Sequence, residues 1–152
     1  MAEGLGSDER GVNVMKYLTE FTDELLRKVK DNVRCIVVFG SRARGDWKPS
    51  SDLDVLVVLK AAPKSFERLK LLPCVPLVEA WAYTEEEFYE ALRKFDLALL
   101  DALEHGKVAY GGFWREAREL FKHFKREWEL EELEHGWISR RIERKALRRR
   151  HE

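Results

Sequence analysis

The alternation of apolar and polar positions predicts a chain of mixed helices and strands. Apolar residues recur at helical spacing over 14–29, which indicates an amphipathic helix that covers a core. Two continuous and largely β-branched runs, 33–39 and 53–59, are typical of buried strands. A polar segment with turn-forming glycine, aspartate and proline separates these two strands.

The second half of the chain continues this mixture. Its predicted elements are a helix over 63–72, a strand over 75–83, a helix from Thr84 to Gly106 and a strand over 107–110. The spacing of Thr84 and Glu87 predicts a capping box, and the last 40 residues are helical in character, with a break at Gly136. We therefore expect an α/β (α+β) fold: a small mixed sheet with helices mainly on one side. Residues 1–112 would form the core and 113–152 a C-terminal helical extension.

Composition narrows the class of protein. Of the 152 residues, 45% are hydrophobic and 37% are charged, which is too much apolar material for a disordered chain. The 28 basic residues balance 28 acidic ones, which argues against a protein that coats nucleic acid by bulk electrostatics. No run approaches the ~20 apolar residues of a membrane span, and the N-terminus lacks the pattern of a secretory signal. We therefore expect a cytoplasmic protein.

Two local features leave alternatives open. The stretch 140–150 carries seven basic residues against Glu143. A solvated helix, contact with an acidic partner protein or contact with RNA would each account for it, although nucleic acid is the less expected partner. Cys35 falls in a predicted strand and Cys74 lies at the start of another, and both are expected to be buried thiols. The sequence does not show whether they pair.

The candidate chemistry lies between the first two predicted strands. Asp52 and Asp54 alternate by two at the start of the second strand, so both carboxylates point to the same face. Two adjacent carboxylates repel each other unless a cation lies between them, and Mg²⁺ prefers such oxygen ligands. Gly40-Ser41 ends the first strand, where a glycine lets backbone N–H groups approach an anion closely. The pattern therefore predicts a site for a metal–triphosphate.

These residues also carry a family resemblance. Gly40-Ser41, ten intervening residues and then Asp-x-Asp resemble the signature of the polymerase-beta-type nucleotidyltransferase superfamily. The Arg-x-Arg-Gly-Asp filling that begins at Arg42 resembles the minimal nucleotidyltransferases, the antitoxin partners of HEPN toxins. The resemblance covers roughly residues 14–112, and the segment 103–110 is similar to the family's helix-to-strand ending.

The resemblance implies roles for the residues that match it. Asp52 and Asp54 would bind Mg²⁺, Gly40 and Ser41 would bind the nucleotide, and Glu79 on the third strand would complete a two-ion site. Arg42 and Arg44 are the nearest candidates to hold phosphate charge. The implied reaction is attack of a hydroxyl on the α-phosphorus of a nucleoside triphosphate, most simply ATP, with pyrophosphate leaving. The implied acceptor is a tyrosine of a partner HEPN-type toxin.

Other functions stay open at this point. The family more often has Asp where this chain has Glu79, so the domain could instead neutralise its partner by occlusion, without catalysis. Transfer to a small molecule or an RNA end is a third hypothesis, with a small acceptor bound across a homo-oligomer. Arg118 and His123 have a spacing that resembles the HEPN ribonuclease motif, but the chain has no room for a separate four-helix toxin domain. The base preference is not encoded in any recognisable motif.

Overall fold

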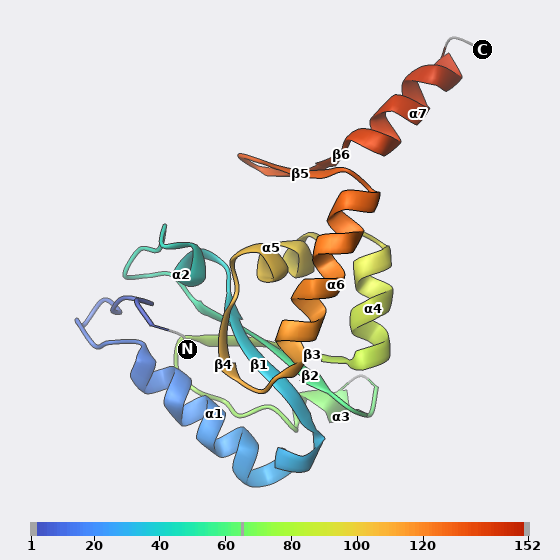
Figure 1. Cartoon of the computed structure of the whole chain (residues 1–152). Coiled ribbons are helices and arrows are strands. Elements are labelled where there is room, and N and C mark those ends of the chain that lie inside the picture. The colour runs from blue at the N-terminus through green and yellow to red at the C-terminus, as the bar shows by residue number, and fades with distance from the viewer. Residues whose placement is uncertain (1–2, 65, 151–152) are drawn as a thin grey trace. The chain divides into compact units, whose positions relative to one another are not determined.

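The computed structural model describes residues 3–64 and 66–150 and has a four-stranded mixed sheet at its centre (Figure 1). Its strands are β1 (Val33–Phe39), β2 (Leu53–Leu59), β3 (Val78–Thr84) and β4 (Lys107–Tyr110). They lie in the order β3-β2-β1-β4, with β1 antiparallel to β2 and β4, and β2 parallel to β3. The predicted fold class is confirmed.

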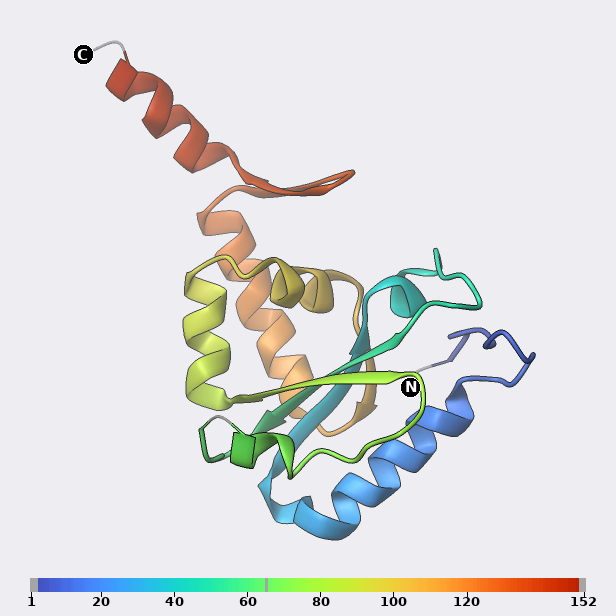
Figure 2. The same cartoon turned by 180° about the vertical axis from the view of Figure 1, so that it is seen from behind.

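Helices cover both faces of this sheet (Figures 1 and 2). On one face lies α1 (Met15–Val29), whose Phe21 and Leu25 share a buried cluster with Ile36 and Val55 of the central strands. The 3-10 helix η1 (Lys30–Asn32) then leads into β1. The other face carries α4 (Glu85–Arg93), α5 (Leu97–His105) and the first residues of α6 (Phe113–Glu127). Since side chains alternate along a strand, neighbours of the α1-facing residues point toward α5.

The single helix predicted from Thr84 to Gly106 is wrong: the structure has two helices there. The capping box of Thr84 and Glu87 is present at the start of α4, as predicted. The chain then turns at Phe95, which has a left-handed φ of 57°. Asp96 caps α5 by accepting a hydrogen bond from the N–H of Leu99 at 3.0 Å. Aspartate is favoured at a helix N-cap and disfavoured within a helix, so Asp96 starts a new helix. The continuous apolar stripe in the sequence did not reveal this break.

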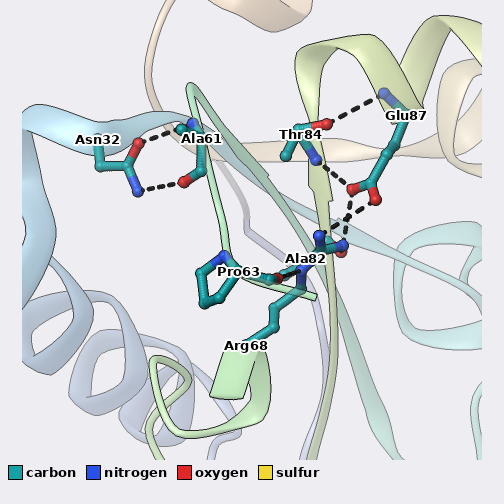
Figure 3. Close-up of polar contacts among 7 residues, drawn as sticks. All are labelled: Asn32, Ala61, Pro63, Arg68, Ala82, Thr84 and Glu87. Atoms are coloured by element: carbon teal, nitrogen blue, oxygen red, sulfur yellow. Dashed lines mark hydrogen bonds and ion pairs between the residues drawn. The ribbon is translucent and has the colours of Figure 1, made fainter. Parts of the chain in front are cut away.

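The helix predicted over 63–72 shortens to α3 (Phe66–Leu69), and one arginine fixes it to the sheet (Figure 3). Arg68 donates to both carboxylate oxygens of Glu87, at 2.6 and 3.1 Å, and also to the carbonyls of Pro63 and Ala82. This guanidinium holds the pKa of Glu87 below its usual range. A side-chain amide makes a similar link, because Asn32 exchanges two hydrogen bonds with the backbone of Ala61.

The two cysteines have different surroundings. Cys35 is buried in β1, and burial raises the pKa of its thiol to about 12. Cys74 is exposed and lies in the loop before β3, so the prediction that it is a buried strand residue is wrong. The adjacent Pro73 and Pro76 lack the N–H groups that a ladder needs, which explains why the strand begins later, at Val78. Both cysteines are free thiols.

The chain divides into two compact units, 1–114 and 115–152. Within the second unit, β5 (Leu130–Leu133) and β6 (Gly136–Ser139) form an antiparallel hairpin before α7 (Arg140–Arg150). The prediction that these last residues are helical in character, with a break at Gly136, missed the hairpin, within which Gly136 has a positive φ of 147°. The basic terminal helix does form as α7. Across the described ranges, no helix is both long and apolar enough to cross a membrane.

Candidate active site

Gly40 and Asp54 meet where β1 ends and β2 begins. Phe39 and Asp54 are register partners, and Gly40 follows Phe39 with a φ of 74° and a ψ of −160°. Only glycine adopts this backbone conformation readily. A Cβ atom at Gly40 would lie 2.2 Å from Oδ2 of Asp54. The glycine is therefore required both by the turn and by the carboxylate that lies against it.

The structure brings the three predicted carboxylates together. Asp54 and Glu79 are register partners on the parallel strands β2 and β3, and Asp52 lies two residues before Asp54. Asp54 is partly buried, whereas Asp52 and Glu79 are exposed. Burial, followed by the charges of Glu79 and Asp52, raises the pKa of Asp54 to about 6. Protonation of Asp54 is therefore favoured first by its burial and then by the two neighbouring carboxylates.

This cluster is not a preformed metal centre, but its chemistry suits a hard cation. Within residues 3–64 and 66–150, no three histidine, cysteine, aspartate or glutamate side chains converge closely enough to hold a metal ion. Burial is the main cause of the raised pKa of Asp54, and repulsion by the charges of Glu79 and Asp52 adds to it. A divalent cation would relieve this repulsion, and carboxylate oxygens are the ligands that Mg²⁺ prefers. The donor set of Asp52, Asp54 and Glu79 therefore fits Mg²⁺.

Arg42 has a structural role that the sequence did not suggest. Its side chain is fully buried, and its guanidinium makes five hydrogen bonds to backbone carbonyls. The acceptors are Leu5, Ser7, Pro49 and Ser51. A guanidinium has five N–H donors, so none remains for a phosphate. The expectation that Arg42 binds the nucleotide is corrected: it ties the N-terminal segment to the loop that leads into Asp52.

Arg44 and Ser41 lie on the short helix α2 (Ser41–Arg44), which follows Gly40. Arg44 donates to Asp46 at 3.4 Å and to Asp101 at 2.9 Å, and its side chain is 34% exposed. Its charge opposes the rise in the pKa of Asp54, which places it within electrostatic range of the carboxylates. Ser41 is the first residue of α2, and the first N–H groups of a helix have no acceptor within it. Arg44 and Ser41 are therefore the phosphate-binding candidates that the structure retains.

Asp101 on α5 is the residue that the sequence interpretation missed. Its Oδ2 accepts the backbone N–H of Gly40 at 3.1 Å, while Oδ1 accepts from Arg44. In the sequence, Asp101 is a single acidic residue within an otherwise apolar segment, 97–103. That isolation was the available signal, but nothing local connects it with Gly40, 61 residues earlier.

The raised pKa of Asp54 predicts that stability falls as pH increases. Between the ordinary pKa of 3.8 and about 6, the folded protein binds more protons than the unfolded chain, so the free energy of unfolding decreases with rising pH. We expect Asp54→Asn to be more stable than wild type by about 1–3 kcal/mol above pH 6.5, and equal to it near pH 3.5. Urea unfolding in EDTA at both pH values measures this. Asp31→Asn on the exposed η1 is the control, and an advantage of Asp54→Asn that does not change with pH would contradict the assignment.

The fold and the carboxylate cluster define a nucleotidyltransferase core, and comparison with known proteins shows the family. The model of the Nucleotidyltransferase domain family matches residues 18–136, and the chain belongs to this family.

The curated proteins to which the chain is similar include two from Methanocaldococcus jannaschii. It is 33% identical over 61 residues to "Putative protein adenylyltransferase MJ0141", which covers 40% of this chain and 62% of that protein. It is 40% identical over 47 residues to "Putative protein adenylyltransferase MJ0604", which covers 31% of this chain and 47% of that protein. The chain thus spans about half to three fifths of the length of these relatives.

A solved structure from Sulfolobus solfataricus, described as a "putative nucleotidyltransferase", supports the fold. The match has a TM-score of 0.50 and 22% sequence identity, and it covers 64% of this chain and 80% of the other.

Proposed function

We propose that this protein transfers a nucleoside monophosphate, AMP from ATP, onto a hydroxyl group of a partner protein. The observation that carries the proposal is the cluster of Asp52, Asp54 and Glu79 beside the Gly40-Ser41 turn, with Arg44 in electrostatic range. The match to relatives named as protein adenylyltransferases supports a protein as the acceptor.

The three carboxylates would hold Mg²⁺, α2 would bind the phosphates, and Glu79 would also act as the general base. Mg²⁺ bound there would offset the charge of the triphosphate and of the pentavalent transition state. The N–H groups at the start of α2 would bind phosphate oxygens at Ser41, and Arg44 would donate to others. Glu79, exposed on β3, would accept the proton of the attacking hydroxyl. The new bond forms between that oxygen and the α-phosphorus, while the bond to pyrophosphate breaks on the opposite side.

The acceptor is proposed from the sequence resemblance. The Arg-x-Arg-Gly-Asp filling of the motif resembles the minimal nucleotidyltransferases, which points to a tyrosine of a HEPN-type toxin. The exposed position of Asp52 and Glu79 is compatible with an acceptor as large as a folded protein, because the carboxylates are reached from solvent.

Labelling with α-³²P-ATP and Mg²⁺, with and without the product of the neighbouring gene, tests this function. We expect label on the partner from the wild type, and a loss of at least about 1,000-fold for Asp52→Asn/Asp54→Asn, since both substitutions remove charge that the metal needs. The matched control, Asp23→Asn/Asp31→Asn, changes two exposed aspartates away from the site and should transfer at the wild-type rate.

Three results would change the conclusion. Equal transfer by the active-site double variant would show that the site is wrongly assigned. Saturable binding of Mg-ATP without label on any protein would favour the occluding module, for which Glu79 in place of Asp is the supporting feature. Label on a small molecule would instead support the third hypothesis.

A further inference from the structure

Asp101 links α5 to both ends of α2. Gly40 immediately precedes α2, and its backbone N–H donates to Oδ2 of Asp101 at 3.1 Å. Arg44 is the last residue of α2, and its Nη1 donates to Oδ1 of the same carboxylate at 2.9 Å. One side chain therefore fixes the start and the end of the short helix that begins with Ser41.

The charges of this pair act on the carboxylate cluster. Burial is the main cause of the raised pKa of Asp54, and of the nearby charges Arg44 opposes the rise while Asp101 adds to it. Asp101 is thus an acidic group in electrostatic range of a site already rich in negative charge. The repulsion between Asp101 and the carboxylate cluster is offset locally, because the two oxygens of Asp101 accept hydrogen bonds from an arginine and a backbone N–H.

The packing of α5 does not require this carboxylate. Leu99, Leu100 and Leu103 are buried and supply the apolar contacts of the helix, and Asp96 supplies its N-cap. The hydrogen bonds of Asp101 go to Gly40 and Arg44, at the edge of the site. Asp101 therefore stabilises the position of α2 rather than its own helix, α5.

We infer that Asp101 is a positioning residue for the nucleotide: it holds Arg44 and the Gly40-Ser41 turn in the orientation that receives the phosphates. This inference rests on the proposed nucleotidyltransferase function. Both partners of Asp101 are donors, so the position needs an acceptor on each oxygen. Asparagine has nearly the same shape but places an NH₂ group opposite one of the donors, which breaks one of the two bonds.

A double-mutant cycle between Asp101 and Arg44 tests the inference. For Asp101→Asn, we expect the Kd of Mg-bound, non-hydrolysable ATP and the KM for ATP each to rise about tenfold, with kcat changed by less than about threefold. Arg44→Gln should show a similar loss of affinity. Because Asp101 acts partly through Arg44 and partly through the Gly40 N–H, adding Asp101→Asn to Arg44→Gln should weaken binding by clearly less than the tenfold expected in the wild type. Calorimetry measures Kd, and thermal unfolding verifies the fold of each variant.

Asp96→Asn is the matched control. It makes the same chemical change on the same helix, and asparagine caps a helix about as well as aspartate, so nucleotide affinity should not change. If Asp101→Asn does not fold, Asp101→Ser takes its place, since the serine hydroxyl can still accept a backbone N–H.

The outcomes separate this inference from the function on which it rests. A folded Asp101→Asn with the wild-type Kd, or effects of Asp101→Asn and Arg44→Gln that simply add, would overturn the positioning role alone. A wild-type protein that binds no nucleotide would overturn both proposals. Coupled losses confined to Kd and KM, with Asp96→Asn unchanged, would support the positioning role.

Discussion

Replacement of Gly40 by alanine is expected to lower the transfer rate by at least about 100-fold. The added Cβ would lie 2.2 Å from Oδ2 of Asp54, so the carboxylate must move away from its place beside Glu79, the register partner of Asp54. A misplacement of ~1 Å at a reacting centre costs about 100-fold in rate. The φ of 74° and ψ of −160° at Gly40 add backbone strain of about 1–3 kcal/mol. Label transfer from α-³²P-ATP measures the first effect, and urea unfolding measures the second.

Gly45→Ala is the control that separates strain from contact. Gly45 also has a positive φ, of 94°, and a Cβ there would meet no atom within 4 Å. It ends the same helix, α2. We therefore expect Gly45→Ala to lose some stability while keeping most of its transfer rate. Equal loss of rate in both variants would show that backbone strain, rather than displacement of Asp54, explains the effect of Gly40→Ala.

Replacement of Arg42 by methionine is expected to lower the free energy of unfolding by about 3–5 kcal/mol. Methionine fills much of the same volume but leaves the carbonyls of Leu5, Ser7, Pro49 and Ser51 without their donor. A buried polar group that loses its partner costs about 1–3 kcal/mol. The guanidinium also lies 4.9 Å from the ring of Trp47, and this contact is lost as well. Denaturant unfolding at constant pH measures the change.

Arg42→Lys and Arg27→Met complete this experiment. Lysine keeps the charge but has three donors in place of five and no planar fork, so we expect it to recover less than half of the lost stability. Arg27 is exposed on α1, and its replacement by methionine should change stability by less than about 0.5 kcal/mol. A small effect of Arg42→Met, comparable with that of Arg27→Met, would contradict the structural role given to Arg42.

The elements that the sequence predicted well are those with strong local signals. The helix over 14–29 and the strands 33–39 and 53–59 appear within one residue of their predicted bounds, because long, uniform apolar patterns leave few other conformations. The predicted helix after Thr84 and the predicted extension after 112 each contain a break. The sequence predicted the break at Gly136 but not the hairpin that forms there, and the periodic pattern could accommodate Asp96; packing selected the cap and the hairpin.

The sequence by itself determined that Asp52 and Asp54 lie together beside the turn at Gly40. Asp52 and Asp54 share a face because side chains alternate along a strand, and Gly40-Ser41 ends a strand whose apolar run is plain in the sequence. Both inferences concern neighbours along the chain, where backbone geometry fixes which groups meet. The place of Glu79 beside these two was implied only by the family resemblance, and it is the parallel register of β2 and β3 that pairs Glu79 with Asp54.

The tertiary structure alone decided what each arginine of the motif does. Arg42 and Arg44 are two residues apart and have similar flanking residues. Arg42 is nevertheless fully buried, and it donates to backbone carbonyls that include those of Leu5 and Ser51. Arg44 instead donates to the carboxylate of Asp101 on α5. These partners are up to 57 residues away, and no local pattern places them. A guanidinium binds whichever acceptors surround it, so its role follows from the fold that brings those acceptors near.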